Sequence, residues 1–152
     1  MSLRGIPLLI LSLIIYNAIV FASGLPPQEI FYGVPALDAA GTAVITKGGQ
    51  LFSISLPSGL VHIRLGDMLL AISIFLMGVE MVKATYTRGF GLVDRLLSPL
   101  LFVLFLVEFL LVPRCATSVF FFLTLMAGID VVVGEVVGIR SAGRNINFGG
   151  NN

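Results

Sequence analysis

The stretch ATSVFFFLTLMAGIDVVVGEVVGI, residues 116–139, contains only two charged side chains, Asp130 and Glu135. About 20 apolar residues of helix are enough to cross the hydrocarbon core of a bilayer. The stretch is long enough to do so, and Arg114 before it and Arg140 after it mark its two ends. We therefore expect 116–139 to form a transmembrane helix.

Three other apolar stretches approach the same length: 6–22, 68–85 and 96–112. Asp67 directly precedes the second, where its carboxylate can accept hydrogen bonds from the free amides of a first helical turn. Pro113 directly follows the third and cannot continue a helix. The expected fold class is an all-α integral membrane protein with four transmembrane helices, in which the whole chain, 1–152, forms a single membrane domain.

The composition excludes an ordinary soluble domain. Of the 152 residues, 57% are hydrophobic and 11% are charged, whereas soluble domains have about 45–50% apolar and about 25% charged residues. So few charges could not cover a water-facing surface, because surface dominates volume in a small domain. The expected partner is therefore the lipid bilayer. The formal charge of +1 and the lack of basic runs argue against nucleic acid.

The first stretch, 6–22, has two interpretations. Arg4 followed by an apolar run that closes on Val20-Phe21-Ala22 resembles a cleaved signal peptide with small residues near its cleavage point. The alternative is a retained membrane anchor, which is the interpretation we expect.

A long polar segment, 23–66, separates the first two helices. Within it, 51–56 and 61–65 alternate apolar and polar side chains over most of their length, the period of a β-strand. Stretch 43–46 is a further candidate strand. Lys47–Gln50 and Pro57–Gly59 contain the glycines and proline typical of tight turns. We expect a three-stranded β-meander, the extracytoplasmic β-loop 41–65, at the outer membrane surface.

The basic residues near the helix ends predict the orientation, because they are more frequent in cytoplasmic loops. With four helices, the N-terminus, the loop after the second helix and the C-terminus share one side. That side has more basic residues: Arg4, Lys83, Arg88, Arg95, Arg140 and Arg144 lie there, against Lys47, Arg64 and Arg114 on the other. Both termini are therefore expected in the cytoplasm. The polar tail 141–152, rich in glycine and asparagine, is expected to be disordered on its own.

Acidic residues inside the expected helices are the main candidates for function. A charged side chain at the bilayer centre costs about 2.5–3.5 kcal/mol on insertion scales. Asp130 is the deepest, about 15 Å from the cytoplasmic end of its helix at the usual rise per residue. It could serve as a protonatable or cation-binding group, or as a carboxyl that bonds to a neighbouring helix or subunit.

The other three acids have simpler expected roles. Glu80 lies three residues before Lys83, close enough for an ion pair within the helix. Glu135 lies about 140° around the helix from Asp130, so the two should not share a face. We expect Glu135 to meet a basic residue at the cytoplasmic rim, and Glu108 to reach the outer interface.

Two further features of 116–139 concern packing. Gly134 and Gly138 form a GxxxG motif, which favours close approach of another helix. Phe120-Phe121-Phe122 is typical of an aromatic belt at the membrane interface, although contact with a hydrophobic cofactor is an alternative.

Catalytic and metal-binding patterns are lacking. Cys115 and His62 are the only residues of their types, so neither a disulfide within the chain nor a Cys/His metal cluster can form. No phosphate loop, HExxH or GxSxG motif occurs. We therefore expect no enzyme and no metal site, and the identity of any cofactor stays unknown because the sequence indicates none.

Several short segments carry a resemblance to a known group: Leu51–Gly59, Gly66–Asp67, Glu80–Thr85, Val107–Pro113, Ala116–Ser118, Ile129–Asp130 and Ile139–Ala142. Over about residues 41–142 the chain resembles uncharacterised small four-span inner-membrane proteins of alphaproteobacteria. The resemblance implies a bacterial inner membrane and implies no activity.

The sequence favours two functions over a third, weaker option, a membrane enzyme that acts on lipid and would need polar groups clustered at one rim. The first is a non-enzymatic accessory or structural subunit of a larger inner-membrane complex, of respiratory or photosynthetic type, with other integral membrane subunits as partners. The second is a proton- or ion-coupled channel or carrier component that uses Asp130.

Overall fold

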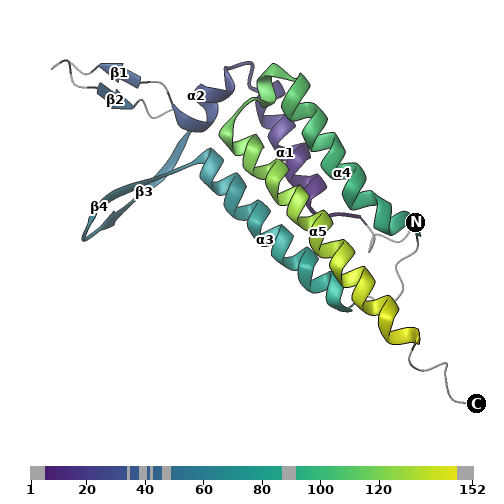
Figure 1. Ribbon diagram of the computed structural model, residues 1–152. Helices are drawn as coiled ribbons and strands as arrows, with labels where there is room; N and C mark the ends of the chain where they lie inside the picture. The colour runs from purple at the N-terminus through teal and green to yellow at the C-terminus, as the bar shows by residue number, and fades with distance from the viewer. Residues whose placement is uncertain are drawn as a thin grey trace, which may run out of the picture.

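The computed structural model describes residues 6–33, 35–37, 41, 43–45, 49–86 and 92–146, with side chains described at 6–33, 41, 49–83 and 96–136. Four long helices lie side by side in one bundle (Figure 1): α1 (Leu9–Ala22), α3 (Leu65–Tyr86), α4 (Leu92–Leu111) and α5 (Ser118–Ile146). Each runs antiparallel to the long helix before it, and α5 packs against all three of the others. A short helix, α2 (Pro27–Tyr32), and a 3-10 turn, η2 (Pro113–Cys115), lie at one end.

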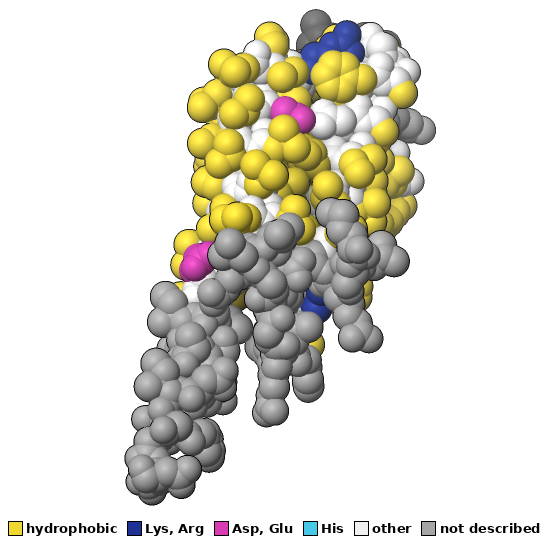
Figure 2. All heavy atoms as spheres, turned by 90° about the vertical axis from the view of Figure 1, so that its right-hand side faces the viewer, with side chains coloured by type: hydrophobic (Ala, Val, Ile, Leu, Met, Phe, Trp, Pro, Cys, Tyr) yellow, Lys and Arg dark blue, Asp and Glu magenta, His cyan; other side chains and the backbone are white. Residues whose placement is uncertain are grey.

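Two of these helices are long and apolar enough to cross a membrane, within Leu65–Lys83 and Ser118–Val136. Only 17% of the apolar segment in α3 and 39% of the one in α5 are buried inside the bundle. The core helix of a soluble protein would be mostly buried. The apolar helices Leu9–Ala22 and Leu96–Leu111 are shorter. Figure 2 shows hydrophobic side chains over much of the described surface on the side of the bundle that faces the viewer. The structure thus confirms a mainly helical chain with long, lipid-compatible helices.

Helix α5 is longer than the sequence predicts. It begins one turn after Pro113, and the backbone amide of Phe120 donates to Oγ1 of Thr117 at 3.2 Å, which satisfies one of the free amides of its first turn. It then continues to Ile146. The expected disorder of 141–152 is therefore wrong for 141–146, because adding a residue to an existing helix costs little once the helix has formed. Residues 147–152 lie outside the described part of the chain.

The expected three-stranded meander is also wrong for the described residues. Strand β2 (Ala43–Ile45) pairs with β1 (Pro35–Leu37), a segment that the sequence analysis did not predict as a strand. Strands β3 (Gln50–Leu56) and β4 (Gly59–Arg64) pair only with each other, as an antiparallel hairpin. The pairing of 51–56 with the second expected strand is thus confirmed up to Arg64, whereas 43–45 joins a different sheet.

The core lies where α1 and α5 meet at the end of the bundle near the hairpins. Tyr16, Phe31, Phe105 and Phe120 are fully buried there. The ring of Phe31 stacks on Tyr16 at 5.1 Å between centroids, and Phe120 meets Tyr16 edge-on at 4.7 Å. Aromatic pairs with these geometries stabilise a core beyond the area they bury. The core therefore joins α2 to the long helices.

Candidate functional site

The polar side chains inside the bundle find their partners within the chain. The hydroxyl of Ser73 donates to Ser12 of α1 at 2.8 Å and also lies 2.7 Å from the carbonyl oxygen of Leu69. Among the described residues, every buried side-chain nitrogen or oxygen atom has a hydrogen-bond partner. Buried polar groups with partners act mainly as contacts between helices.

Glu80 of α3 holds the beginning of α1. Its side chain is 9% exposed, and Oε2 accepts a hydrogen bond from the backbone amide of Leu8 at 3.0 Å. The first amides of a helix lack partners within it and carry a partial positive charge, so a carboxylate stabilises them. Nζ of Lys83 donates to the carbonyl oxygen of Ile6 at 3.3 Å. The two residues expected to form an ion pair thus each bind the segment that leads into α1.

Asp130 of α5 belongs to the same region. Its side chain is 7% exposed, and Ser98 of α4 forms a side-chain hydrogen bond with it. The charge of Lys83 acts on Asp130, and the carboxyl of Asp130 acts in turn on Glu80. The structure therefore brings Glu80, Lys83, Ser98 and Asp130 together from three helices. The cluster therefore links α3, α4 and α5 through polar side chains.

The other two acids lie apart from this cluster. Oε2 of Glu108 accepts from Nδ2 of Asn17 at 2.9 Å, so this half-buried side chain bonds to α1. Glu135 is exposed, whereas Asp130 is buried, so the two carboxyls lie on different faces of α5. The basic residues expected near Glu135 lie outside the described side chains.

A second polar cluster, which sequence reasoning missed, centres on Tyr16. Its hydroxyl donates to the carbonyl oxygen of Arg114 at 3.1 Å and shares a hydrogen bond of 2.8 Å with the Thr117 hydroxyl. Nη1 of Arg114 donates to the carbonyl oxygen of Val20, near the end of α1, at 3.0 Å. The signal available in the sequence was a tyrosine within an apolar helix, since a buried tyrosine hydroxyl usually has a partner.

Replacing Tyr16 with phenylalanine is expected to lower the free energy of unfolding by about 1–3 kcal/mol, since a hydrogen bond contributes about 0.5–1.5 kcal/mol and two are lost. The ring contacts with Phe31 and Phe120 remain in this variant. Denaturation by sodium dodecyl sulphate in mixed micelles, followed by circular dichroism, measures the loss. An unchanged midpoint would contradict the inferred role of the hydroxyl.

Cys115 directly follows Arg114 of the Tyr16 cluster, and its Sγ donates to Oδ1 of Asn17 at 4.0 Å. It is fully buried in η2, and burial, with a smaller contribution from the negative charge of Glu108, raises the pKa of its thiol to about 11. The thiolate is the reactive form of cysteine. The thiol is therefore protonated at neutral pH and shielded from reagents.

We expect iodoacetamide at neutral pH to modify Cys115 slowly in the folded protein and rapidly after denaturation. The matched control is Ala116→Cys in a Cys115→Ser background, because residue 116 is the exposed neighbour. Mass spectrometry measures both rates. Equal rates for the two folded variants would contradict the burial of Cys115.

The glycines of α5 differ in their surroundings. A Cβ atom at Gly128 would lie 3.2 Å from Cε2 of Phe102, so α4 and α5 approach closely there. A Cβ atom at Gly134 would meet nothing within 4 Å. The surroundings of Gly138 lie outside the part of the chain whose side chains the structure describes. Gly134 of the expected GxxxG motif thus has an open side in this chain.

An apolar groove of about 470 Å³ lies between α4 and α5. Its lining includes Phe102, Phe109, Phe121, Leu125 and Val132. Phe121 and Phe122 are about half exposed, whereas Phe120 is fully buried. The phenylalanine run is therefore divided between the core and the outer surface of the bundle.

No protein-family model, curated protein or solved structure matches this chain. Among the described residues, no group of three or more histidine, cysteine, aspartate or glutamate side chains could hold a metal ion. What the site can do chemically therefore follows from its geometry: the Tyr16 and Glu80 clusters connect helices.

Proposed function

We propose that this chain is a multi-pass protein of a bacterial inner membrane and a non-enzymatic structural subunit of a larger complex. The observation that carries the proposal is the contrast between interior and surface. The interior polar groups bond within the chain, and the outer faces of the long helices expose large apolar side chains such as Phe75, Leu100 and Val132. Such a chain has a surface for lipid and for apolar partner helices.

The proposal includes four membrane spans. Helix α1 has 14 residues, about 21 Å of helix, which is shorter than the hydrocarbon core of about 30 Å. It nevertheless packs against α3 and α5, so it shares their depth. A bilayer adapts to a short helix by local thinning at modest cost.

The orientation follows the excess of basic residues around the termini and the loop after α3. Both termini then lie in the cytoplasm, and the hairpins lie on the extracytoplasmic side of the inner membrane. The resemblance to four-span inner-membrane proteins of alphaproteobacteria supports the same location. Respiratory and photosynthetic complexes are the natural hosts for such a subunit.

The test is purification of the tagged native protein in a mild detergent, followed by native electrophoresis and mass spectrometry of the co-migrating band. We expect a large complex of fixed stoichiometry. A lone protein or a homo-oligomer would remove the proposal.

A variant pair makes this test sharper. Gly134→Leu is expected to weaken the association, because it fills the open side of α5. Gly78→Leu is the matched control, since a Cβ atom at this α3 glycine also meets nothing within 4 Å. Both variants should therefore keep the fold of the monomer, and an equal effect of the two would argue against a partner at Gly134.

A second function is supported by the Glu80–Asp130 cluster. Two carboxyls, a lysine and a serine inside an apolar bundle form a group that can bind and release a proton during ion-coupled transport. With four helices, an oligomer would be needed to form a pathway. Asp130→Asn should then abolish proton flux in proteoliposomes while assembly is retained, and Glu135→Gln, at an exposed acid of the same helix, should not. Unchanged flux in Asp130→Asn would remove this function.

A further inference from the structure

The β3–β4 hairpin has one apolar face and one more polar face. Residues opposite each other in an antiparallel pair point to the same face, and successive residues alternate between faces. The register pairs Phe52 with Ile63, Ile54 with Val61 and Leu56 with Gly59. The alternate pairs are Ser53 with His62 and Ser55 with Leu60. The side chains of one face are therefore Phe52, Ile54, Leu56, Val61 and Ile63, which we call the apolar hairpin face.

No described residue of this chain covers the apolar hairpin face. Every residue from 51 to 62 is exposed, and Phe52, Ile54 and Leu56 keep 47%, 44% and 46% of their surface accessible. An isolated two-stranded hairpin is at best marginally stable in water. Clustered apolar side chains on a protein surface usually mark a contact with a partner or a membrane.

The direction of the hairpin is set by its attachment to the bundle. Strand β4 ends at Arg64 and α3 begins at Leu65, so no linker separates them. The amide of Leu65 donates to the carbonyl oxygen of Gly49 at 2.7 Å, and the amide of Arg64 donates to Oδ2 of Asp67 at 2.9 Å. Nη1 of Arg64 also donates to the carbonyl oxygen of Tyr32 in α2. These bonds join the base of the hairpin to both α2 and α3.

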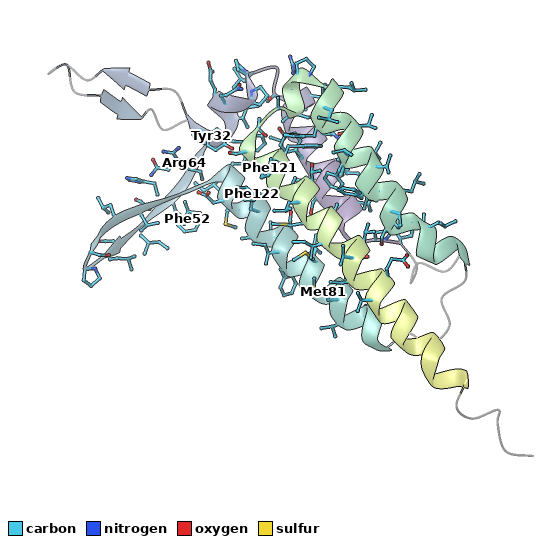
Figure 3. The ribbon with its side chains drawn as sticks, in the orientation of Figure 1. Tyr32, Phe52, Arg64, Met81, Phe121 and Phe122 are labelled. Carbon is cyan, nitrogen blue, oxygen red and sulfur yellow. The ribbon has the colours of Figure 1, made fainter. Side chains whose placement is uncertain are left out.

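The hairpin extends sideways from the end of the bundle at which α3 begins (Figure 1). Figure 3 places Phe52 on the side of the hairpin that faces along the body of α3, and Arg64 on the opposite side. The body of α3 exposes Ile72, Ile74 and Phe75. The apolar hairpin face thus points toward the level at which the lipid-facing side chains of α3 lie.

We infer that the β3–β4 hairpin is an interfacial anchor whose apolar face inserts into the boundary between lipid headgroups and acyl chains. Its opposite face, with Ser53, Ser55 and His62 beside the single exposed Leu60, is directed to water. Amphipathic elements bind this boundary through their apolar area. The anchor holds the outer end of the bundle at a constant depth. The inference rests on the membrane-embedded state in the proposed function.

The lack of tryptophan in the chain makes a single-tryptophan experiment possible. Ile54→Trp places the probe on the apolar hairpin face, and Ser53→Trp places it on the opposite face at the adjacent position. Phe75→Trp, at an exposed site on α3, reports membrane insertion itself. Each variant is reconstituted in phosphatidylcholine vesicles at a low protein-to-lipid ratio. Quenching is then measured with brominated lipid and with aqueous acrylamide.

We expect Trp fluorescence in Ile54→Trp to be quenched strongly by brominated lipid and weakly by acrylamide, with the reverse in Ser53→Trp. Two results overturn the inference while Phe75→Trp is still quenched by lipid. The first is acrylamide quenching of both hairpin variants, which places the hairpin in water. The second is protection of Ile54→Trp from both quenchers, which indicates a protein partner or a second copy. If Phe75→Trp is itself not quenched by lipid, the membrane-embedded state fails, and the inference fails with it.

Discussion

Replacing Phe120 with alanine is expected to lower the free energy of unfolding by about 3–5 kcal/mol, the usual cost of removing a buried aromatic ring. Phe120 is fully buried. Its ring contacts Tyr16 at 4.7 Å, Phe105 at 5.6 Å and Phe109 at 6.4 Å between centroids. These partners belong to α1 and α4, so the cavity would open where three helices meet.

The matched control is Phe121→Ala at the next position of the same helix. Phe121 is 47% exposed, and lipid or detergent can fill the space that its ring leaves. Titration with sodium dodecyl sulphate in mixed micelles, followed by circular dichroism, measures both variants. Similar losses for Phe120→Ala and Phe121→Ala would contradict the division of the phenylalanine run between core and surface.

Gly49→Ala is expected to displace the base of the hairpin and to cause the second large loss of stability. A Cβ atom at Gly49 would lie 2.1 Å from the carbonyl oxygen of Ile30, which belongs to the backbone of α2. Overpacking of this kind costs about 1–3 kcal/mol. The φ angle of Gly49 is 71°, a left-handed conformation that costs a residue with a side chain about 1–2 kcal/mol more.

Gly24→Ala separates the two contributions. Gly24 has a similar φ of 67°, but a Cβ atom there would meet nothing within 4 Å. Its loss of stability should therefore reflect the backbone conformation alone. Chemical denaturation gives both values, and hydrogen exchange of the Leu65 amide, which donates to Gly49, reports on the base of the hairpin. Equal losses and unchanged exchange would contradict a close contact between Gly49 and α2.

The local elements of this chain were predictable from the sequence. The apolar stretches 6–22, 68–85, 96–112 and 116–139 all became helices, because length and composition of an apolar run are local properties. The β3–β4 hairpin followed from alternation on either side of a Pro57-Ser58 turn. The helix ends were less certain, and α5 continued to Ile146 because helix growth depends on the turns already formed.

The partners of each element were decided only by the tertiary structure. Strand β2 pairs with β1 instead of β3. The alternation of apolar and polar residues predicts a strand but not its pairing partner. The same holds for side chains. Three adjacent phenylalanines look alike in the sequence, yet only Phe120 faces the core.

For the candidate site, the sequence by itself determined which residues were acidic and in which apolar stretch each lies. It also separated Asp130 from Glu135, since their angle around one helix is a local property. Only the tertiary structure joined Asp130 to Ser98 and Glu80, directed Glu80 to the amide of Leu8 and placed Tyr16 against Thr117. The physical reason is that these contacts connect residues far apart in the chain, and their positions depend on how whole helices pack.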